Sequence, residues 1–439
     1  MDLTYPAEAE AFRREVRDFL AAHLPPGWTG VGSLPADEVG PFTDRWRSLL
    51  HEHGLIGVAW PQQYGGRGLS KLEQVVLVEE LAQAGAPAGW STDNFSVKMI
   101  GNTLLAVGTD EQKRRFLPRV LSGADRWCQG FSEPGAGSDL GALRTRARLV
   151  RAEGEVRGAI GGEWHIDGQK AWTSNAREAN WIFLLARTSP ARPGNRGLTF
   201  LLCPLDQPGI EIRPITMLSG HQEFNEVFFN DAVTGTGNVV GEVGDGWRVA
   251  QILLGFERGD EAATNPILFR QELDRLIALA RSRHRDQDPV IRDRLASCLA
   301  RVEVMRYLGY RILTGFLRGD RPGPEASVAK LYWSEYHRDL TELAMDILDA
   351  DGVVPAGQPV GRIIRTDLPG AQNSSASWSG TFLAAQAGTI YAGTSDIQRN
   401  VLAETVLGLP REPRPGGQAT TKRTCVPAMN PAARSANNF

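Results

Sequence analysis

The chain contains two closely spaced apolar runs, Trp181-Ile182-Phe183-Leu184-Leu185 and Leu198-Thr199-Phe200-Leu201-Leu202. Together they decide how the chain is divided into domains. Short apolar runs between Gly and Pro residues are typical of buried strands. We expect the turn signals Asp167-Gly168 and Pro193-Gly194-Asn195 to separate the strands of this region. Outward from these runs the chain is rich in Gly, Thr, Val, Ile, Phe and Trp, which predicts a middle β domain over residues 127–236.

Apolar residues recur at helical spacing on both sides of this region. Before it, the pattern covers Phe12 to Leu20, Trp46 to Leu50 with Gly54 as a stop, Val75 to Ala84, and Gln112 to Leu121. After Gly246 it covers Leu268 to Ala280, Leu295 to Leu308, and Ala329 to Leu348. Helices, then strands, then helices predict an α+β multidomain fold. We expect an N-terminal helical domain over 1–126, a C-terminal helical domain over 237–412, and a flexible tail over 413–439.

Composition excludes several classes of protein. The 439 residues are 42% hydrophobic and 23% charged, which favours a large globular core. A net charge of −3 gives no electrostatic reason to expect nucleic acid. The N-terminus has no signal-peptide pattern and no apolar run is long enough to span a bilayer, so we expect a cytoplasmic protein. The four cysteines show no CxxC spacing, and the seven histidines form no metal-ligand pattern.

Two glycine-rich stretches do not match the common nucleotide-binding loops. Gly135 to Ser138 is not a Walker loop, because no Gly-Lys-Ser/Thr follows it. Gly235-x-Gly237-x-x-x-Gly241 misses the Rossmann spacing by one residue and leads into no clear βαβ unit. Binding of a nicotinamide cofactor is therefore disfavoured.

Five motifs follow one another in an order that is known from one family. They are Trp60-Pro61-Gln62-Gln63-Tyr64-Gly65-Gly66, Ser132-Glu133-Pro134-Gly135-Ala136-Gly137-Ser138-Asp139, Gly168-Gln169-Lys170-Ala171-Trp172-Thr173-Ser174-Asn175, Val240-Gly241-Glu242-x-Gly244-x-Gly246-Trp247, and Tyr391-Ala392-Gly393-Thr394-Ser395-Asp396-Ile397-Gln398-Arg399. From about residue 6 to Glu412 the chain resembles the acyl-CoA dehydrogenases, especially their actinobacterial branch. The resemblance implies a β-barrel-like middle domain and a C-terminal four-helix bundle.

The resemblance implies an FAD site. Ser132 would approach the pyrimidine edge of the flavin, Trp172 would pack against the isoalloxazine ring, and Ser174 would hydrogen-bond N5. A donor at N5 stabilises reduced flavin, and a flat ring needs an aromatic wall. The further implied cofactor contacts are Gln129, Phe131, Arg283, Thr394 and Asp396, and the implied substrate contacts are Ser138, Arg258, Ala392 and Gly393.

Alanine at position 392 removes the group that many relatives use as a base, a glutamate that takes the α-proton of the substrate. The Ala392 N–H still polarises the thioester carbonyl in this comparison. A minority of the family carries its base in a Glu-Arg pair after the β domain, and Glu257-Arg258 stands at the matching place. Glu257 is therefore the candidate base, with Asp260 and Glu261 as nearby alternatives on other helix faces.

Two segments depart from the family pattern where the resemblance implies contact with the FAD of a neighbouring subunit. Arg283-His284-Arg285-Asp286-Gln287 replaces Arg-x-x-Phe-Gly, and Asp346-Ile347-Leu348-Asp349-Ala350 replaces Gln-x-x-Gly-Gly. Carboxylates beside a pyrophosphate are unfavourable. The chain is therefore expected in a homo-oligomer with weakened contacts, or in a hetero-oligomer with a related subunit that supplies the missing half.

The predicted activity is FAD-dependent α,β-dehydrogenation of an acyl-CoA thioester in fatty acid or lipid metabolism, with electrons leaving to an electron-transfer flavoprotein. Two alternatives stay open. One is a flavin monooxygenase of the same fold, which needs no base. The other is a subunit that completes the FAD site of a hetero-oligomeric dehydrogenase. The acyl group, the choice between CoA and an acyl carrier protein, and the direction of the pathway stay open as well.

Overall fold

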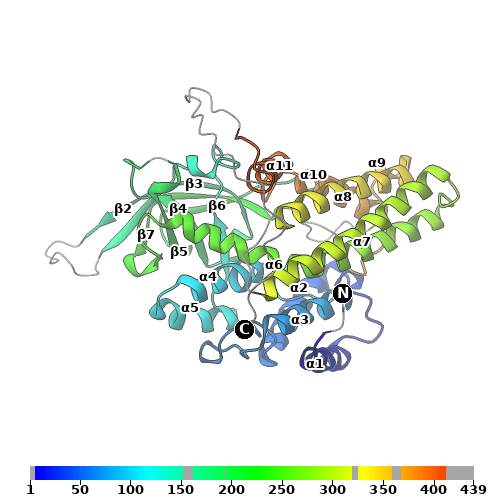
Figure 1. The fold of residues 1–439 in the computed structure, drawn as a ribbon, viewed down its shortest axis with the longest axis horizontal. Coiled ribbons are helices and arrows are strands. Elements are labelled where there is room, and N and C mark those ends of the chain that lie inside the picture. Colours follow the sequence, from blue (N-terminus) through cyan, green and yellow to red (C-terminus); the bar gives the residue numbers. More distant parts are fainter. Residues whose placement is uncertain (1–4, 152–161, 193, 319–324, 358–366, 412–439) are drawn as a thin grey trace, which may run out of the picture.

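The structure is a computed structural model that describes residues 5–151, 162–192, 194–318, 325–357 and 367–411, without the side chains of residues 257–261, 316, 317 and 326. The predicted tail over 413–439 lies outside the described residues. Figure 1 shows the sheet at the left, the N-terminal helices below it, and α7 and α8 extending to the right.

The N-terminal part is helical, as the apolar spacing predicts. Its helices are α1 (Ala7–His23), α2 (Ala36–Glu52), α3 (Lys71–Gln83), η3 (Asn94–Gly101), α4 (Asn102–Val107) and α5 (Asp110–Ser122). Capping boxes begin α3 at Ser70 and α5 at Thr109, where a side chain three residues later bonds back to the N-cap amide. The apolar face of α1, including Phe12 and Val16, is buried.

The middle part is a single eight-stranded sheet. Its strands are β1 (Trp127–Gly130), β2 (Arg146–Val150), β3 (Glu163–Ser174), β4 (Trp181–Arg187), β5 (Leu198–Pro204), β6 (Ile210–Pro214), β7 (Phe224–Gly235) and β8 (Val239–Val240). The order is β6-β7-β3-β2-β4-β5-β8, and β1 pairs with β4 in parallel. The two apolar runs that divide the sequence form β4 and β5, which pair antiparallel and are buried.

One predicted turn is wrong. Asp167-Gly168 does not end a strand, because both residues lie inside β3. The pairing of β3 with β7 shifts register between Ile166 and Gly168, so the strand continues through an irregularity. Gly168 is needed for a close approach, since an added Cβ would lie 2.7 Å from Cα of Thr145, and its φ of 146° lies in a region that side chains rarely adopt.

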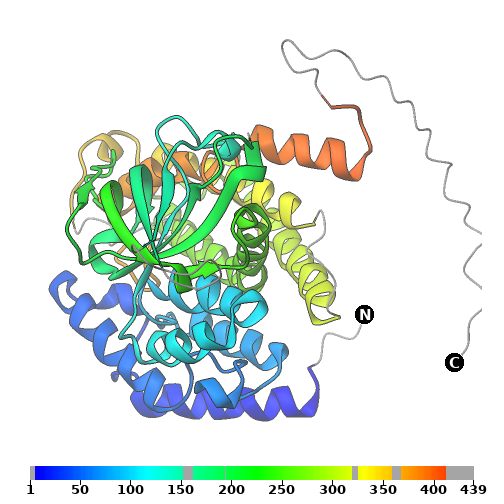
Figure 2. The same cartoon turned by 90° about the vertical axis from the view of Figure 1, so that its left-hand side faces the viewer.

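The C-terminal part returns to helices at Gly246, as predicted. It comprises α6 (Gly246–Ser282), α7 (Pro289–Leu317), α8 (Glu325–Leu348), α9 (Ala350–Val353), α10 (Ser375–Gly388), α11 (Ser395–Val401) and η8 (Leu402–Val406). The long helix α6 contacts α3, η3, β5, α7 and α8, so it joins the three parts of the chain. In Figure 2 the blue and cyan N-terminal helices lie below the green sheet. Nowhere in the described part of the chain is a helix both long and apolar enough to span a membrane.

Candidate active site

A cavity of about 1510 Å³ lies where the three parts meet. Its walls come from α3 and η3, from the ends of β1 and β3, from α6, α7 and α8, and from the turn before α11. The predicted site residues that line this cavity are Gln129, Phe131, Ser132, Ser138, Trp172, Ser174, Ala392, Gly393 and Thr394. Residues from motifs more than 200 positions apart in the sequence are therefore brought to one space.

Four predicted site residues are placed differently. Glu257 and Arg258 lie within α6, but their side chains are outside the described residues. Asp396 lies in the first turn of α11, and its side chain is 92% exposed and absent from the cavity wall. Arg283 follows the end of α6, away from the cavity, and its Nη1 donates to Oδ2 of Asp351 at 2.7 Å.

A β-bulge turns Trp172 into the cavity. The register of β3 against β7 shifts between Lys170 and Thr173, and Trp172 adopts a left-handed φ of 60°. Its side chain is held at one edge by Phe224, with ring centroids 5.8 Å apart, and the residue remains 59% exposed. Bulges commonly re-aim one side chain in this way. A large aromatic face left open to a cavity is available to a ligand, whereas a core tryptophan would be covered by protein.

These residues fit a flat aromatic cofactor with polar edges. Trp172 offers an apolar face, while the hydroxyl-bearing residues Ser132 and Ser174 line the same cavity. Ser132 is held close to β3, because its carbonyl accepts a hydrogen bond from the Ala171 amide at 2.9 Å. An isoalloxazine ring has this combination of an apolar face and hydrogen-bonding edges.

A buried ion pair supports the glycine-rich loop, defined here as residues 132–139, which begins with Ser132. Nζ of Lys170 donates to Oε1 of Glu133 at 2.8 Å and to the carbonyl of Phe131 at 3.2 Å. The carboxylate of Glu133 also accepts hydrogen bonds from the amides of Arg144 and Thr145. Burial alone raises the pKa of Glu133, but the Lys170 ammonium and these hydrogen bonds outweigh it and lower the pKa.

The turn before α11 has two consecutive residues in left-handed conformations. Ala392 has a φ of 52° and Gly393 a φ of 89°. Nε2 of Gln398 donates to the carbonyl of Ala392 at 3.0 Å, and Oγ1 of Thr394 accepts from the amide of Ile397 to begin α11. Among the described residues, no group accepts a hydrogen bond from the Ala392 amide. An amide of the cavity lining that has no acceptor among the described residues is available to a ligand oxygen.

Part of the cavity wall, here named the apolar end, consists of apolar side chains. Its lining includes Leu77, Val78 and Leu81 of α3, Leu254 and Leu268 of α6, and Met305, Leu308 and Ile312 of α7. Such a wall suits an aliphatic or ring-bearing group, and the small side chain of Ala392 does not fill the space near the turn.

Two polar residues of the cavity lining come from an element that the sequence patterns do not reveal. Asn94 and Lys98 line the cavity from η3, a π-helix. Helices of this kind occur often at functional sites. They do not follow the spacing of an α-helix, and the segment carries no motif. The apolar residues between Phe95 and Ile100 are the only signal that a helix lies there.

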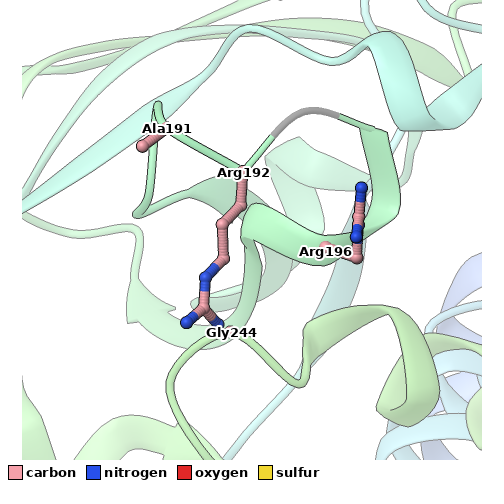
Figure 3. Close-up of a pocket in the computed structure, with 4 residues that line it drawn as sticks. All are labelled: Ala191, Arg192, Arg196 and Gly244. Carbon is pink, nitrogen blue, oxygen red and sulfur yellow. The ribbon is translucent and has the colours of Figure 1, made fainter.

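A second, smaller cavity of about 500 Å³ is lined by Ala191, Arg192, Arg196 and Gly244. Figure 3 shows Arg192 extending toward Gly244, while Arg196 projects from a separate helical turn. The two guanidinium groups give this surface positive charge, but they do not converge on a common point, and we assign no ligand to it.

Comparisons with known proteins agree with this arrangement. Models of the acyl-CoA dehydrogenase N-terminal, middle and C-terminal domains match residues 6–124, 128–232 and 244–407. Acyl-CoA dehydrogenase IpdE1 of Mycolicibacterium smegmatis is 42% identical over 410 residues, which are 92% of this chain and 99% of that protein. The chain belongs to the acyl-CoA dehydrogenase family.

Two solved structures are similar over nearly the whole chain. The structure named Tcur3481-Tcur3483 steroid ACAD has a TM-score of 0.73 at 31% identity and covers 94% of this chain and 100% of its own. The ChsE4-ChsE5 complex from Mycobacterium tuberculosis has a TM-score of 0.73 at 27% identity, with the same coverage. The three-domain fold of the family is thus confirmed.

Proposed function

We propose that the chain carries out FAD-dependent α,β-dehydrogenation of an acyl-CoA thioester. The observation that carries the proposal is the single cavity that joins Trp172 of β3 to the Ala392 turn. One side of this cavity suits a flavin ring, and the other presents an amide without a partner among the described residues. FAD, when bound, supplies the acceptor for the β-hydride at its N5.

The residues of this chain have separate tasks. The Ala392 amide binds the thioester oxygen and stabilises the negative charge that develops there when the α-proton leaves. Glu257 of α6 takes that proton, since position 392 offers no carboxylate. Ser138 binds the phosphopantetheine arm, and Arg258 balances the charge of its neighbour. Removal of the proton by Glu257 and departure of the hydride leave an α,β-unsaturated thioester.

The proposed substrate class is a bulky, ring-bearing acyl group. The apolar end of the cavity is built from three helices, and Ala392 leaves room where relatives carry glutamate. The similar structure named steroid ACAD points to the same class. A straight short chain would leave much of this apolar wall uncovered and would gain less from burial.

The test is anaerobic bleaching of the flavin absorbance by a panel of acyl-CoAs. Butyryl-CoA, octanoyl-CoA, isobutyryl-CoA and a cholanoyl-CoA are added to the flavin-loaded protein with and without an electron-transfer flavoprotein. We expect the cholanoyl thioester to bleach the flavin fastest. Oxygen consumption with a reduced flavin, without bleaching by any thioester, would instead indicate the monooxygenase.

A hetero-oligomer is the second candidate, and the pairing of Arg283 with Asp351 favours it. This guanidinium, which the family resemblance assigns to the pyrophosphate of a neighbouring FAD, is occupied within its own chain. The similar structures include an assembly of two named chains, ChsE4 and ChsE5. Each FAD would then use Ser132, Trp172 and Ser174 of this chain with an arginine from the partner.

A further inference from the structure

Lys330 is an ionisable residue of the cavity wall that the proposed reaction has not used. It lies in the second turn of α8, it is only 9% exposed, and it lines the large cavity. Its Nζ donates to the carbonyl of Gly393 at 2.6 Å. Among the described residues no carboxylate pairs with it, and a buried ammonium without such a partner is costly, so its place beside the Ala392 turn needs a reason.

The hydrogen bond of Lys330 completes the support of that turn. Both carbonyls of the two left-handed residues are bound by side chains, that of Ala392 by Gln398 and that of Gly393 by Lys330. These two hydrogen bonds restrict the conformation of the turn, and with it the orientation of the Ala392 amide. A donor that is fixed in advance stabilises developing charge without a cost of reorganisation.

Several charged groups on α8 and on the helices packed against it are paired with other residues. Glu335 of α8, whose charge acts on the ammonium, pairs with Arg399 of α11. On the facing helix α7, Arg301 pairs with Asp339 and Arg311 with Glu325. The segment Ser375–Gly388 of α10 contains no ionisable residue. On α6, the side chains of Glu257, Arg258, Asp260 and Glu261 are outside the described residues.

Burial makes the Lys330 ammonium easier to deprotonate. It lowers the pKa of Lys330 to about 8, and the charge of Glu335 opposes this effect only in part. The lysine therefore carries its charge below about pH 8 and loses it as the pH rises through that value. Its hydrogen bond to Gly393 is charge-assisted only while the proton is present.

We propose that Lys330 is a positioning residue that holds the Ala392–Gly393 turn in place and adds positive charge beside the thioester oxygen during proton removal. The inference rests on the proposed function. It adds a side-chain cation to the contact that the Ala392 amide makes with the thioester oxygen. Neither Ala392 nor Gly393 carries a charge of its own.

Three variants test this role: Lys330→Arg, Lys330→Met, and the control Lys113→Met on α5, which lies away from the cavity. Turnover of the acyl-CoA that bleaches the flavin fastest is measured between about pH 6 and about pH 10, a range that spans the titration of a lysine with a lowered pKa. Wild type and control should lose turnover above about pH 8. Lys330→Arg should move this loss to higher pH, because arginine stays charged.

Lys330→Met should lower kcat about tenfold or more at neutral pH, with a smaller change in KM and no alkaline loss, since the group that titrates is gone. Flavin content and Tm show whether each variant is folded. If Lys330→Met does not fold, the pH dependence of Lys330→Arg is the test of the inference. If Lys330→Arg loses turnover at the same pH as wild type, the group that titrates is another one, such as Lys170. That result would overturn the inference. Absence of bleaching in the wild type overturns the proposed function instead, and this inference with it.

Discussion

The ammonium of Lys170 lies 2.8 Å from a carboxylate oxygen of Glu133, and both side chains are buried between β3 and the glycine-rich loop. The pair links the loop that carries Ser132 to the strand that carries Trp172. Burial lowers the pKa of Lys170 to about 8, and the charge of Glu133 and the hydrogen bond to it oppose this effect. The proposed flavin face of the cavity thus depends on this pair, of which Glu133 belongs to the cavity lining and Lys170 does not.

Replacement of one partner should expose this dependence. Lys170→Met leaves a buried carboxylate without its cation and should lower the free energy of unfolding by about 3 to 5 kcal/mol. Urea unfolding of the purified chain measures the change in the free energy of unfolding. The flavin content shows whether the loop still supports cofactor binding. Arg213→Ala removes the cation of an exposed pair with Glu211 and serves as the control, for which we expect an unchanged midpoint. Equal midpoints for both variants would show that the pair does not stabilise the loop.

Glu257→Gln should keep FAD and CoA binding and lose at least about 100-fold in turnover, the usual scale for removal of a general base. Stopped-flow measurement of flavin reduction separates the chemical step from binding. Asp260→Asn and Glu261→Gln are the matched controls on the same helix, and they should reduce turnover little. If one of these two variants shows the large loss and Glu257→Gln does not, the base is that neighbour.

Position 392 should accept a carboxylate that replaces the one removed. Ala392 lines the cavity, and the family resemblance implies that many relatives carry glutamate at this position. In the Glu257→Gln background, Ala392→Glu should therefore restore part of the turnover, about tenfold or more above the single variant. Rates are measured with butyryl-CoA as well as a ring-bearing thioester, because the larger side chain takes up space. A double variant no faster than Glu257→Gln would mean that the turn does not aim a side chain at the α-carbon.

Trp172→Ala should weaken FAD binding at least about fivefold, since a stacked ring contributes about 1 kcal/mol beyond its buried area. The bulge in β3 and the exposure of this ring place it on the cavity side, so its removal should leave the fold intact. Fluorescence titration of the apoprotein with FAD measures the affinity, and Trp172→Phe, which keeps an aromatic face, should bind nearly as well as wild type. Unchanged affinity and flavin spectrum in the alanine variant would remove Trp172 from the site.

The sequence predicts the layout of the fold well because the relevant signals are local. The apolar period of α1 and the runs that form β4 and β5 are each read within a few residues. The Asp167-Gly168 turn fails because pairing of β3 with β7 overrides a local preference, and Gly168 serves a close approach to Thr145.

The residues of the candidate site were predictable where a motif contains them or lies next to them. Ser132, Trp172 and Ala392 belong to such motifs, and all line the cavity. Lys330 belongs to none, and its partner Gly393 is 63 residues away, so its role follows from tertiary contact alone. Asn94 and Lys98 were missed because the spacing of a π-helix differs from that of an α-helix.

The ion pair of Arg283 with Asp351 bears on how the chain assembles. Nη1 of Arg283 also lies 3.5 Å from the carbonyl of Leu348, so the guanidinium is held against the end of α8. Asp346, in the same segment, is paired with Arg294 of α7. A guanidinium with these partners is poorly disposed to bind a pyrophosphate, and the adjoining carboxylates repel one.

We therefore expect the chain purified alone to contain well under one FAD per chain, and to bind FAD fully only when it is produced with a related subunit that has the usual arginine segment. Light scattering gives the mass of each preparation, and absorbance gives the flavin content. Asp351→Asn, which weakens the hold on Arg283, should raise the FAD content of the lone chain, because a freed guanidinium can reach a phosphate. Asp339→Asn, which releases Arg301 on α7 instead, is the control and should have no effect. A homodimer or homotetramer of the wild-type chain with one FAD per chain would contradict the need for a partner.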